Sequence, residues 1–226
     1  MKNVFLCICL VSSLLGFSQD WANMNFFKEK NQQVMAEGKL VAAVFMGNSI
    51  TQGWVDMRPD FFAANSFVNR GIGGQTTPQM LLRFRQDVID LKPKAVVILA
   101  GINDIAENTG PISLEDIAAN IESMVELAIA HGIHPLVCSV LPANNFPWRP
   151  EISPREKVIK LNELLLAITE KHQVTYVDYY VSAVDNEGGL KIDLGYDTVH
   201  PNDKGYQMLE PIILESLQSV LQYLFP

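Results

Sequence analysis

The strongest constraint on the fold is an alternation of short apolar runs with segments of helical periodicity. Five apolar runs rich in β-branched residues lie at residues 40–46, 66–68, 95–100, 135–140 and 174–177. Near-continuous apolar runs of this length are typical of strands that are buried on both faces. Strands that alternate with helices form a parallel sheet covered by helices on both sides. The sequence therefore predicts the α/β class.

Start and stop signals place helices between these strands. Four helices are predicted to begin at Thr77-Pro78, at Ser113, at the capping box Ser153-Pro154-Arg155-Glu156 and at Asn202. Lys92-Pro93 should end the first of them, and Gly132 the second. Pro211 is expected to kink or split the last one. Residues 23–37 are a candidate helix before the first strand.

The first 18 residues are predicted to be a signal peptide. Lys2 precedes an apolar run over residues 4–17, and small residues stand before a plausible cleavage site at Gln19. The run is shorter than the ~20 residues of a membrane-spanning helix. A buried N-terminal helix is the alternative. A lipoprotein is not favoured, because Cys7 and Cys9 lie inside the apolar run and not just after it. We expect a periplasmic or secreted protein with residues 19–226 as one domain.

Composition narrows the classes of partner. The 17 Lys and Arg against 25 Asp and Glu give a formal net charge of −8, which argues against nucleic acid. No basic run suggests binding to an anionic membrane surface, and no stable membrane insertion is expected after removal of the signal. Only Cys138 would remain after that removal, so no internal disulfide is expected.

Four polar segments follow the predicted strands. Their sequences are GNSIT at 47–51, NRGIGGQT at 69–76, GIND at 101–104 and DTVHP at 197–201. The first three follow strand ends directly, and the fourth follows the last strand after a loop. Open parallel sheets bind ligands at the carboxyl ends of their strands. We therefore expect all four segments to converge at one edge of the sheet.

These segments carry the residues of acyl transfer. Ser49 is the candidate nucleophile, and His200 is the base that would take its proton. Asp197 can hold the other imidazole nitrogen and stabilise the imidazolium. Negative charge on the substrate carbonyl needs preorganised donors, and the candidates are the backbone N–H groups of Ser49 and Gly74 and the side-chain amide of Asn103.

The four segments, in this order, resemble the SGNH (GDSL-type) hydrolase family over about residues 40 to 210. Within that family, the stretch from 69 to 103 is most similar to the acetylhydrolases related to the platelet-activating-factor enzyme. The resemblance implies a flavodoxin-like three-layer α/β/α sandwich around a five-stranded parallel sheet, with no metal and no cofactor. It also implies the roles given above for Ser49, Gly74, Asn103, Asp197 and His200.

The first segment departs from the family pattern. The family usually has Gly-Asp-Ser where this chain has Asn at position 48. Asn keeps an acceptor oxygen but loses the charge, which leaves open how the turn around Ser49 is fixed. Asn48, Trp54, Trp148 and Arg149 are candidate substrate contacts. Trp148 and Arg149 follow the fourth strand, where loops carry specificity, and offer a stacking face and a donor fork to a sugar or a polar acyl group. A rigid loop that packs Trp148 on the body of the protein is the alternative.

The sequence thus predicts a serine esterase for short acyl groups, most simply acetyl, on a small-molecule or glycan ester. A lysophospholipase or thioesterase for longer chains is one alternative, and a non-catalytic carbohydrate-binding protein is another. A phosphate-binding loop at Gly73-Gly74 is disfavoured, because the segment lacks the phosphate-loop motif. A flavin or phosphate binder is disfavoured, because the short turn at 47–51 is a poor phosphate cradle. The α/β-hydrolase elbow is disfavoured, because position 51 is Thr and not Gly. The segment HGIH at 131–134 is better explained by a helix end than by metal binding.

Overall fold

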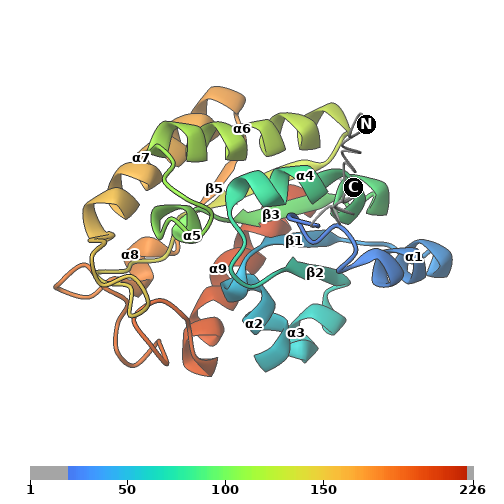
Figure 1. Ribbon diagram of the computed structural model, residues 1–226. Helices are drawn as coiled ribbons and strands as arrows, with labels where there is room; N and C mark the ends of the chain where they lie inside the picture. The colour runs from blue at the N-terminus through green and yellow to red at the C-terminus, as the bar shows by residue number, and fades with distance from the viewer. Residues whose placement is uncertain (1–19, 223–226) are drawn as a thin grey trace, which may run out of the picture.

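The computed structural model describes residues 20–222 of the 226-residue chain (Figure 1). The predicted signal peptide over residues 1–18 lies outside the described residues. Among the described residues, no helix combines the length and the apolar character needed to cross a membrane.

A five-stranded parallel sheet forms the centre of the protein, in the order β2-β1-β3-β4-β5. Its strands are β1 Ala43–Gly47, β2 Phe67–Gly71, β3 Ala95–Leu99, β4 His134–Cys138 and β5 Thr175–Val177. All four pairings are parallel. Gly47, the last residue of β1, pairs with Gly71 and Leu99, so the central strands end level with one another. The structure confirms the predicted α/β fold.

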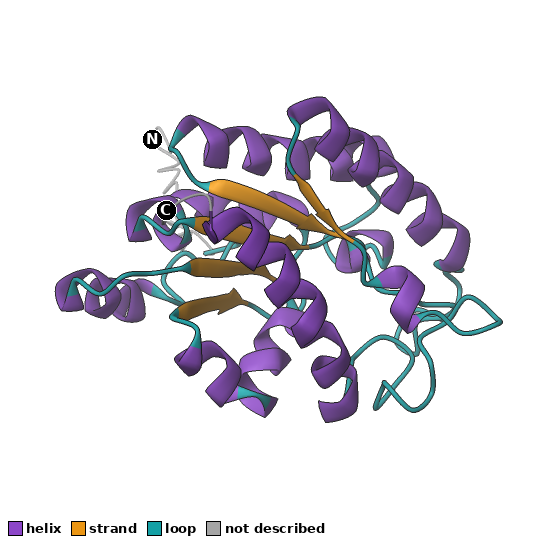
Figure 2. Ribbon diagram, turned by 180° about the vertical axis from the view of Figure 1, so that it is seen from behind, coloured by secondary structure: helices purple, strands orange, loops and turns teal. Residues whose placement is uncertain are grey.

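Helices cover both faces of the sheet (Figures 1 and 2). The described helices are α1 Lys28–Glu37, α2 Ser49–Met57, α3 Pro59–Ala64, α4 Thr77–Asp87, η1 Ile89–Leu91, α5 Ile102–Ile105, α6 Leu114–Ala130, α7 Arg155–His172, α8 Tyr180–Ala183 and α9 Asp203–Gln222. α4, α6 and α7 pack together on one face, and α2, α3 and α9 lie on the other (Figures 1 and 2). This arrangement is the expected three-layer sandwich.

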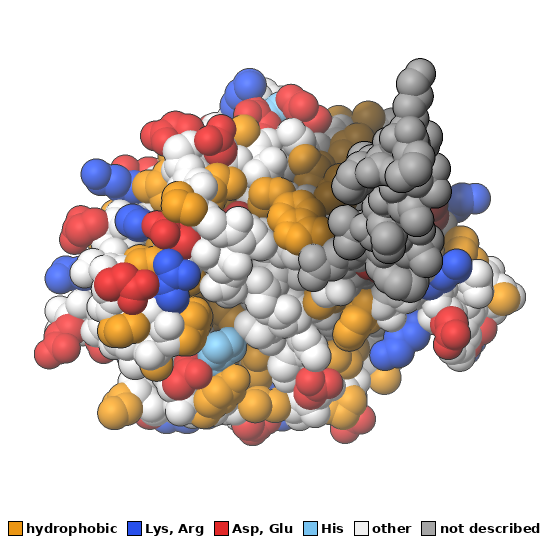
Figure 3. Space-filling view, in the orientation of Figure 1, with side chains coloured by type: hydrophobic (Ala, Val, Ile, Leu, Met, Phe, Trp, Pro, Cys, Tyr) orange, Lys and Arg blue, Asp and Glu red, His pale blue; other side chains and the backbone are white. Residues whose placement is uncertain are grey.

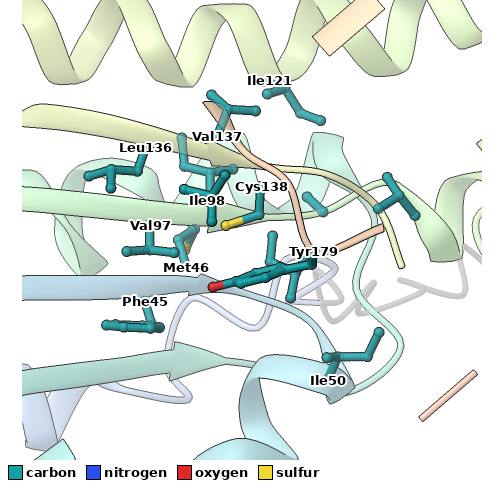
Figure 4. Close-up of a cluster of buried hydrophobic side chains, with 14 of the residues drawn as sticks. Phe45, Met46, Ile50, Val97, Ile98, Ile121, Leu136, Val137, Cys138 and Tyr179 are labelled. Atoms are coloured by element: carbon teal, nitrogen blue, oxygen red, sulfur yellow. The ribbon is translucent and has the colours of Figure 1, made fainter. Parts of the chain in front are cut away.

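The core consists of side chains from the strands and the inward faces of the helices. β1 and β3 are buried along their whole length, which accounts for their apolar sequences. Figure 4 shows Phe45 and Met46 of β1 beside Val97 and Ile98 of β3. Cys138 is a buried residue at the end of β4.

Three predicted helix boundaries need correction. Thr76 and not Thr77 is the N-cap of α4, because the side chain of Gln79 accepts a hydrogen bond from the Thr76 N–H (3.0 Å) and completes a capping box. The capping box predicted at Ser153 does not form, because α7 begins at Arg155 with Pro154 in the cap position. α9 continues through Pro211 without being split. Pro211 and Gln207, whose carbonyl the proline leaves without an N–H partner, are exposed, so water can bind that carbonyl.

Candidate active site

The candidate site lies at the level carboxyl ends of the central strands. Close backbone contact there requires glycine at two positions. A Cβ on Gly47 would lie 2.0 Å from the Thr51 hydroxyl oxygen, and a Cβ on Gly71 would lie 2.2 Å from the Gln52 nitrogen. Because neither residue has a side chain, the first turn of α2 can pack directly onto the ends of β1 and β2.

Ser49 is the first residue of α2, and Asn48 is its N-cap. The Asn48 side-chain oxygen accepts a hydrogen bond from the Ile50 N–H (3.0 Å). This bond fixes the turn before Ser49 and needs no charge, which explains why Asn can replace the usual Asp. Asn48 is 1% exposed, so the expectation that it contacts substrate is wrong. The cap of α2 uses the side-chain oxygen, and almost no surface of the residue is left for a ligand.

Ser49, His200 and Asp197 form a continuous hydrogen-bonded chain. The Ser49 Oγ lies 3.0 Å from His200 Nε2, and His200 Nδ1 lies 2.9 Å from Asp197 Oδ2. The second carboxylate oxygen, Oδ1, accepts from the backbone N–H groups of Val199 (2.8 Å) and His200 (2.7 Å). The structure thus brings together three residues that the motifs predicted, two of them more than 140 positions from Ser49 along the chain.

Asp197 is held as a carboxylate. Partial burial raises the pKa of Asp197, but hydrogen bonds from the backbone of His200 and Val199 and from the imidazole outweigh it, so the net pKa is lowered. The residue is therefore ionised at neutral pH and can stabilise a positive charge on His200.

The three N–H groups predicted to stabilise the oxyanion follow the carboxyl ends of β1, β2 and β3. The Ser49 N–H belongs to the first turn of α2, where a helix has no internal acceptor for it. Gly74 has a φ of +75°, and the space where its side chain would stand is open. Asn103 donates one amide hydrogen to the Gln75 carbonyl oxygen (3.0 Å), which leaves a second hydrogen on the same nitrogen. The loop that carries Gly74 passes next to Ser49, since a Cβ on Gly73 would lie 3.9 Å from the Ser49 Cβ.

A buried arginine supports the loop that carries Gly74. Sequence reasoning missed this arginine. The Arg83 guanidinium is fully buried and donates to the Gly47 carbonyl (3.1 Å), to the Gln75 side chain (2.5 Å) and to Asp87 (2.9 Å). One side chain thus ties the end of β1, before the nucleophile, to the loop that carries Gly74. The available signal was an arginine at a position of α4 that helical spacing places on its inward face.

Asp104, next to Asn103, makes a second buried support. Its carboxylate accepts from the Thr77 N–H (2.9 Å and 3.1 Å) and from the Thr77 hydroxyl (2.6 Å). α5, which carries Asn103, is thereby fixed to the start of α4. Burial raises the pKa of Asp104 to about 6, although the bonds from Thr77 oppose this shift.

Trp54 does not reach the site. It is 1% exposed and stacks between Phe61 and Tyr206, each at a ring distance of 5.5 Å. The expectation that Trp54 contacts substrate is therefore wrong. The α2 helix turns this side chain into the core, where its aromatic surface is removed from water.

The loop after β4 lies over His200. Trp148 is 42% exposed, packs on the buried Phe146 and lies 6.1 Å from the His200 ring. Arg149 pairs instead with Glu151 (2.7 Å) and Glu107 (3.5 Å). Its guanidinium thus holds the loop in place and is not a free donor fork.

Sequence reasoning also missed Tyr196. Its ring lies 5.4 Å from the His200 ring at an interplanar angle of 9°, and the side chain is 62% exposed. No periodicity marks a loop tyrosine of this kind. The only available signal was its place four residues before His200.

A group of potential metal ligands lies between α6 and α7, in the part of the chain that covers residues 20–222. Within this range, Glu122, Glu126 and His172 are the one group of three whose ligand atoms come together. Lys171 already pairs with Glu122 there (2.8 Å). His131 is the C-cap residue of α6, which agrees with the helix end predicted for residues 131–134.

Comparison with known proteins also indicates a hydrolase. The family model of the GDSL-like Lipase/Acylhydrolase family matches residues 45–208. A GDSL-like lipase from Bacteroides thetaiotaomicron is 42% identical, with a TM-score of 0.83 over 88% of this chain and 98% of that one. An acylhydrolase structure from Bacteroides fragilis, described as putative in its own name, is also 42% identical, with a TM-score of 0.86 over 90% and 99%.

More distant relatives were also found. The human platelet-activating factor acetylhydrolase IB subunit alpha2 is 27% identical over 79% of this chain and 77% of its own length. A lipoprotein of Bacillus subtilis named YqeF is 27% identical, and the match spans 63% of this chain and 66% of the relative. An acetylxylan esterase from Geobacillus stearothermophilus, at 21% identity and a TM-score of 0.63 over 77% of this chain and 93% of its own, shares the fold.

Proposed function

Since the chain belongs to the GDSL-like lipase/acylhydrolase family and is a hydrolase of the esterase type, we propose that Ser49, His200 and Asp197 are its catalytic triad. The observation that carries this assignment is the chain of hydrogen bonds from the Ser49 hydroxyl through His200 to Asp197. A nucleophile, a base within hydrogen-bond reach and a group that orients the base together define this mechanism.

In the acylation step, His200 Nε2 takes the hydroxyl proton as Ser49 Oγ attacks the ester carbonyl. The carbonyl π electrons move onto oxygen, and the N–H groups of Ser49, Gly74 and Asn103 stabilise the resulting oxyanion. The imidazolium then gives its proton to the leaving alcohol as the carbon–oxygen bond breaks. The acyl group remains on Ser49 as an ester.

In the deacylation step, water takes the place of the alcohol. His200 removes a proton from the water, the hydroxide attacks the acyl-enzyme, and the same donors hold the second oxyanion. Collapse releases the carboxylic acid and returns the proton to Ser49 Oγ. No step requires a metal or an organic cofactor.

The acyl group is proposed to be short, with acetyl on a carbohydrate as the leading substrate. Two kinds of relative support this choice, one named for platelet-activating-factor acetylhydrolysis and the other for acetylxylan. The exposed Trp148 beside His200 adds an aromatic surface of the kind that packs on sugar rings. A periplasmic or secreted location is proposed from the signal-peptide pattern of residues 1–18.

The test is hydrolysis of p-nitrophenyl acetate and p-nitrophenyl octanoate by the mature chain, with Ser49→Ala alongside. We expect turnover of the acetate ester that Ser49→Ala abolishes. A preference for octanoate would instead favour a lipase or thioesterase for longer chains. No turnover above the Ser49→Ala background on either ester would contradict the catalytic assignment and favour a non-catalytic carbohydrate-binding protein.

A further inference from the structure

Two exposed aromatic rings stand against His200, and the catalytic mechanism uses neither. Tyr196 lies 5.4 Å from the imidazole and is nearly parallel to it. Trp148 lies 6.1 Å away at 39°. They are 62% and 42% exposed, and both present an aromatic surface beside the base.

Contacts within the protein fix the ring of Trp148 and the backbone of Tyr196. Trp148 stacks on Phe146, which is fully buried, at 5.3 Å. The Tyr196 N–H donates to the His200 carbonyl oxygen (3.1 Å), so the tyrosine is tied to the loop that carries the base. The two loops are also joined to each other, because the Thr198 hydroxyl bonds to the Asn145 side chain (3.1 Å). Rings that are already ordered can bind a ligand with a small loss of side-chain entropy.

Their position next to His200 decides which half of the ester they would touch. The imidazolium must deliver its proton to the oxygen of the leaving alcohol, so the alcohol lies beside His200 during acylation. The acyl oxygen is directed instead to the donors of Gly74 and Asn103, which follow β2 and β3. The two rings therefore face the alcohol and not the acyl chain.

The polar groups around the rings favour a neutral alcohol. Asn144, Asn145 and Thr198 place amides and a hydroxyl beside the two loops, and these are suitable partners for sugar hydroxyls. Two charged side chains of these loops are already paired, Asp197 with His200 and Arg149 with two glutamates. Figure 3 shows hydrophobic side chains at the surface at the lower left, with acidic side chains among them.

We propose that Tyr196 and Trp148 form a subsite for the alcohol half of the ester, and that this subsite takes the ring of a neutral O-acetylated sugar. The proposal rests on the proposed esterase function. The flat ring faces pack on the C–H surface of the sugar, while the sugar hydroxyls bond to the side chains of Asn144, Asn145 and Thr198. Substrate specificity would then lie in the two loops and not in the parallel sheet.

The test compares two acetate esters with different alcohols. Fully acetylated methyl β-xylopyranoside presents a sugar ring, and ethyl acetate presents no ring. Acetate release gives kcat/KM for each. In Tyr196→Ala and in Trp148→Ala, we expect the ratio of kcat/KM for the xyloside to that for ethyl acetate to fall by about tenfold or more. Tyr196→Phe keeps the ring face and should restore the wild-type ratio.

Ile129→Ala is the matched control. Ile129 is 45% exposed, close to the 42% of Trp148, and lies in the last turn of α6, which leads to the start of β4 at the opposite edge of the sheet. In Ile129→Ala, the ratio of kcat/KM for the xyloside to that for ethyl acetate should stay within about threefold of the wild-type ratio.

The outcomes separate this proposal from the esterase function. If the alanine variants lose activity equally on both esters, the rings only support His200, and the subsite is refuted while the esterase stands. If the wild type hydrolyses ethyl acetate but not the xyloside, or if it prefers an acetylated glycerophosphocholine whose hydrolysis depends on the two rings, the sugar is the wrong alcohol. If no ester is hydrolysed, the proposed function itself fails.

Discussion

Replacing Asp104 by Asn should remove a pH dependence from the stability of the protein. Burial raises the pKa of Asp104 to about 6 from its usual 3.8, so the folded chain holds this proton more tightly than the unfolded chain does. For a group whose pKa is higher in the folded state, the free energy of unfolding falls as pH rises from about 4 to about 6. Above pH 6 the whole of this stability is lost. At 1.36 kcal/mol for each pKa unit, about two units correspond to about 3 kcal/mol.

The Asn side chain suits this test because it can keep most of the native hydrogen bonds. Its oxygen can occupy the Oδ1 position, which accepts from the Thr77 N–H (2.9 Å) and hydroxyl (2.6 Å). The amide nitrogen would take the position of Oδ2, which accepts from the Thr77 N–H (3.1 Å), so two donors would face each other there. This cost does not depend on pH. The charge is therefore removed with little change of shape.

The assay is urea unfolding followed by tryptophan fluorescence at pH 4, 5, 6 and 7, since the buried Trp54 reports on the core. Between pH 4 and pH 7, the free energy of unfolding of Asp104→Asn should rise by up to about 3 kcal/mol relative to that of the wild type. Asp60→Asn, at an exposed carboxylate in the first turn of α3, is the control and should shift by less than about 1 kcal/mol. A difference between wild type and Asp104→Asn that stays constant within about 0.5 kcal/mol across this range would refute the argument.

Three further predictions follow from the site geometry. Ser49→Ala and His200→Ala should each lower kcat on p-nitrophenyl acetate by several orders of magnitude, and the double variant should cost little more, because triad members act as a unit. Asn103→Ala should lower kcat about 10²–10³-fold, and a loss below about tenfold would contradict its role as an oxyanion donor. Arg83→Met should destabilise the fold by about 3–5 kcal/mol in urea unfolding, because it leaves the buried Asp87 charge unpaired. Arg83→Met with Asp87→Leu should recover part of that loss, and no recovery would mean that the bonds to Gly47 and Gln75 dominate.

Local sequence patterns predicted much of the fold. The apolar runs of β1 and β3 are buried on both faces, and this burial is what a continuous apolar sequence indicates. Ser113 accepts from the Asp116 N–H at the start of α6, as its capping signal predicted. β2 was harder to see, because its second half contains Asn69 and Arg70, and polar residues hide the end of an edge strand.

The order of the polar segments along the chain also predicted the position of the candidate site. Parallel strands deliver their carboxyl ends to one edge, so Ser49, Gly74 and Asn103 follow the ends of β1, β2 and β3 there by topology alone. The residue types then indicated the chemistry. His200 and Asp197 were found by their spacing of three residues, a local feature that survives in any fold.

Only the tertiary structure decided which side chains are exposed at the candidate site. Trp54 and Trp148 are the same residue type, yet Trp54 is sealed between Phe61 and Tyr206 while Trp148 stands exposed over His200. Likewise, Arg83 supports the site from inside, and Arg149 is held at the surface by Glu107 and Glu151. Sequence determines backbone preference over a few residues, whereas burial is determined by contacts between segments far apart in the chain.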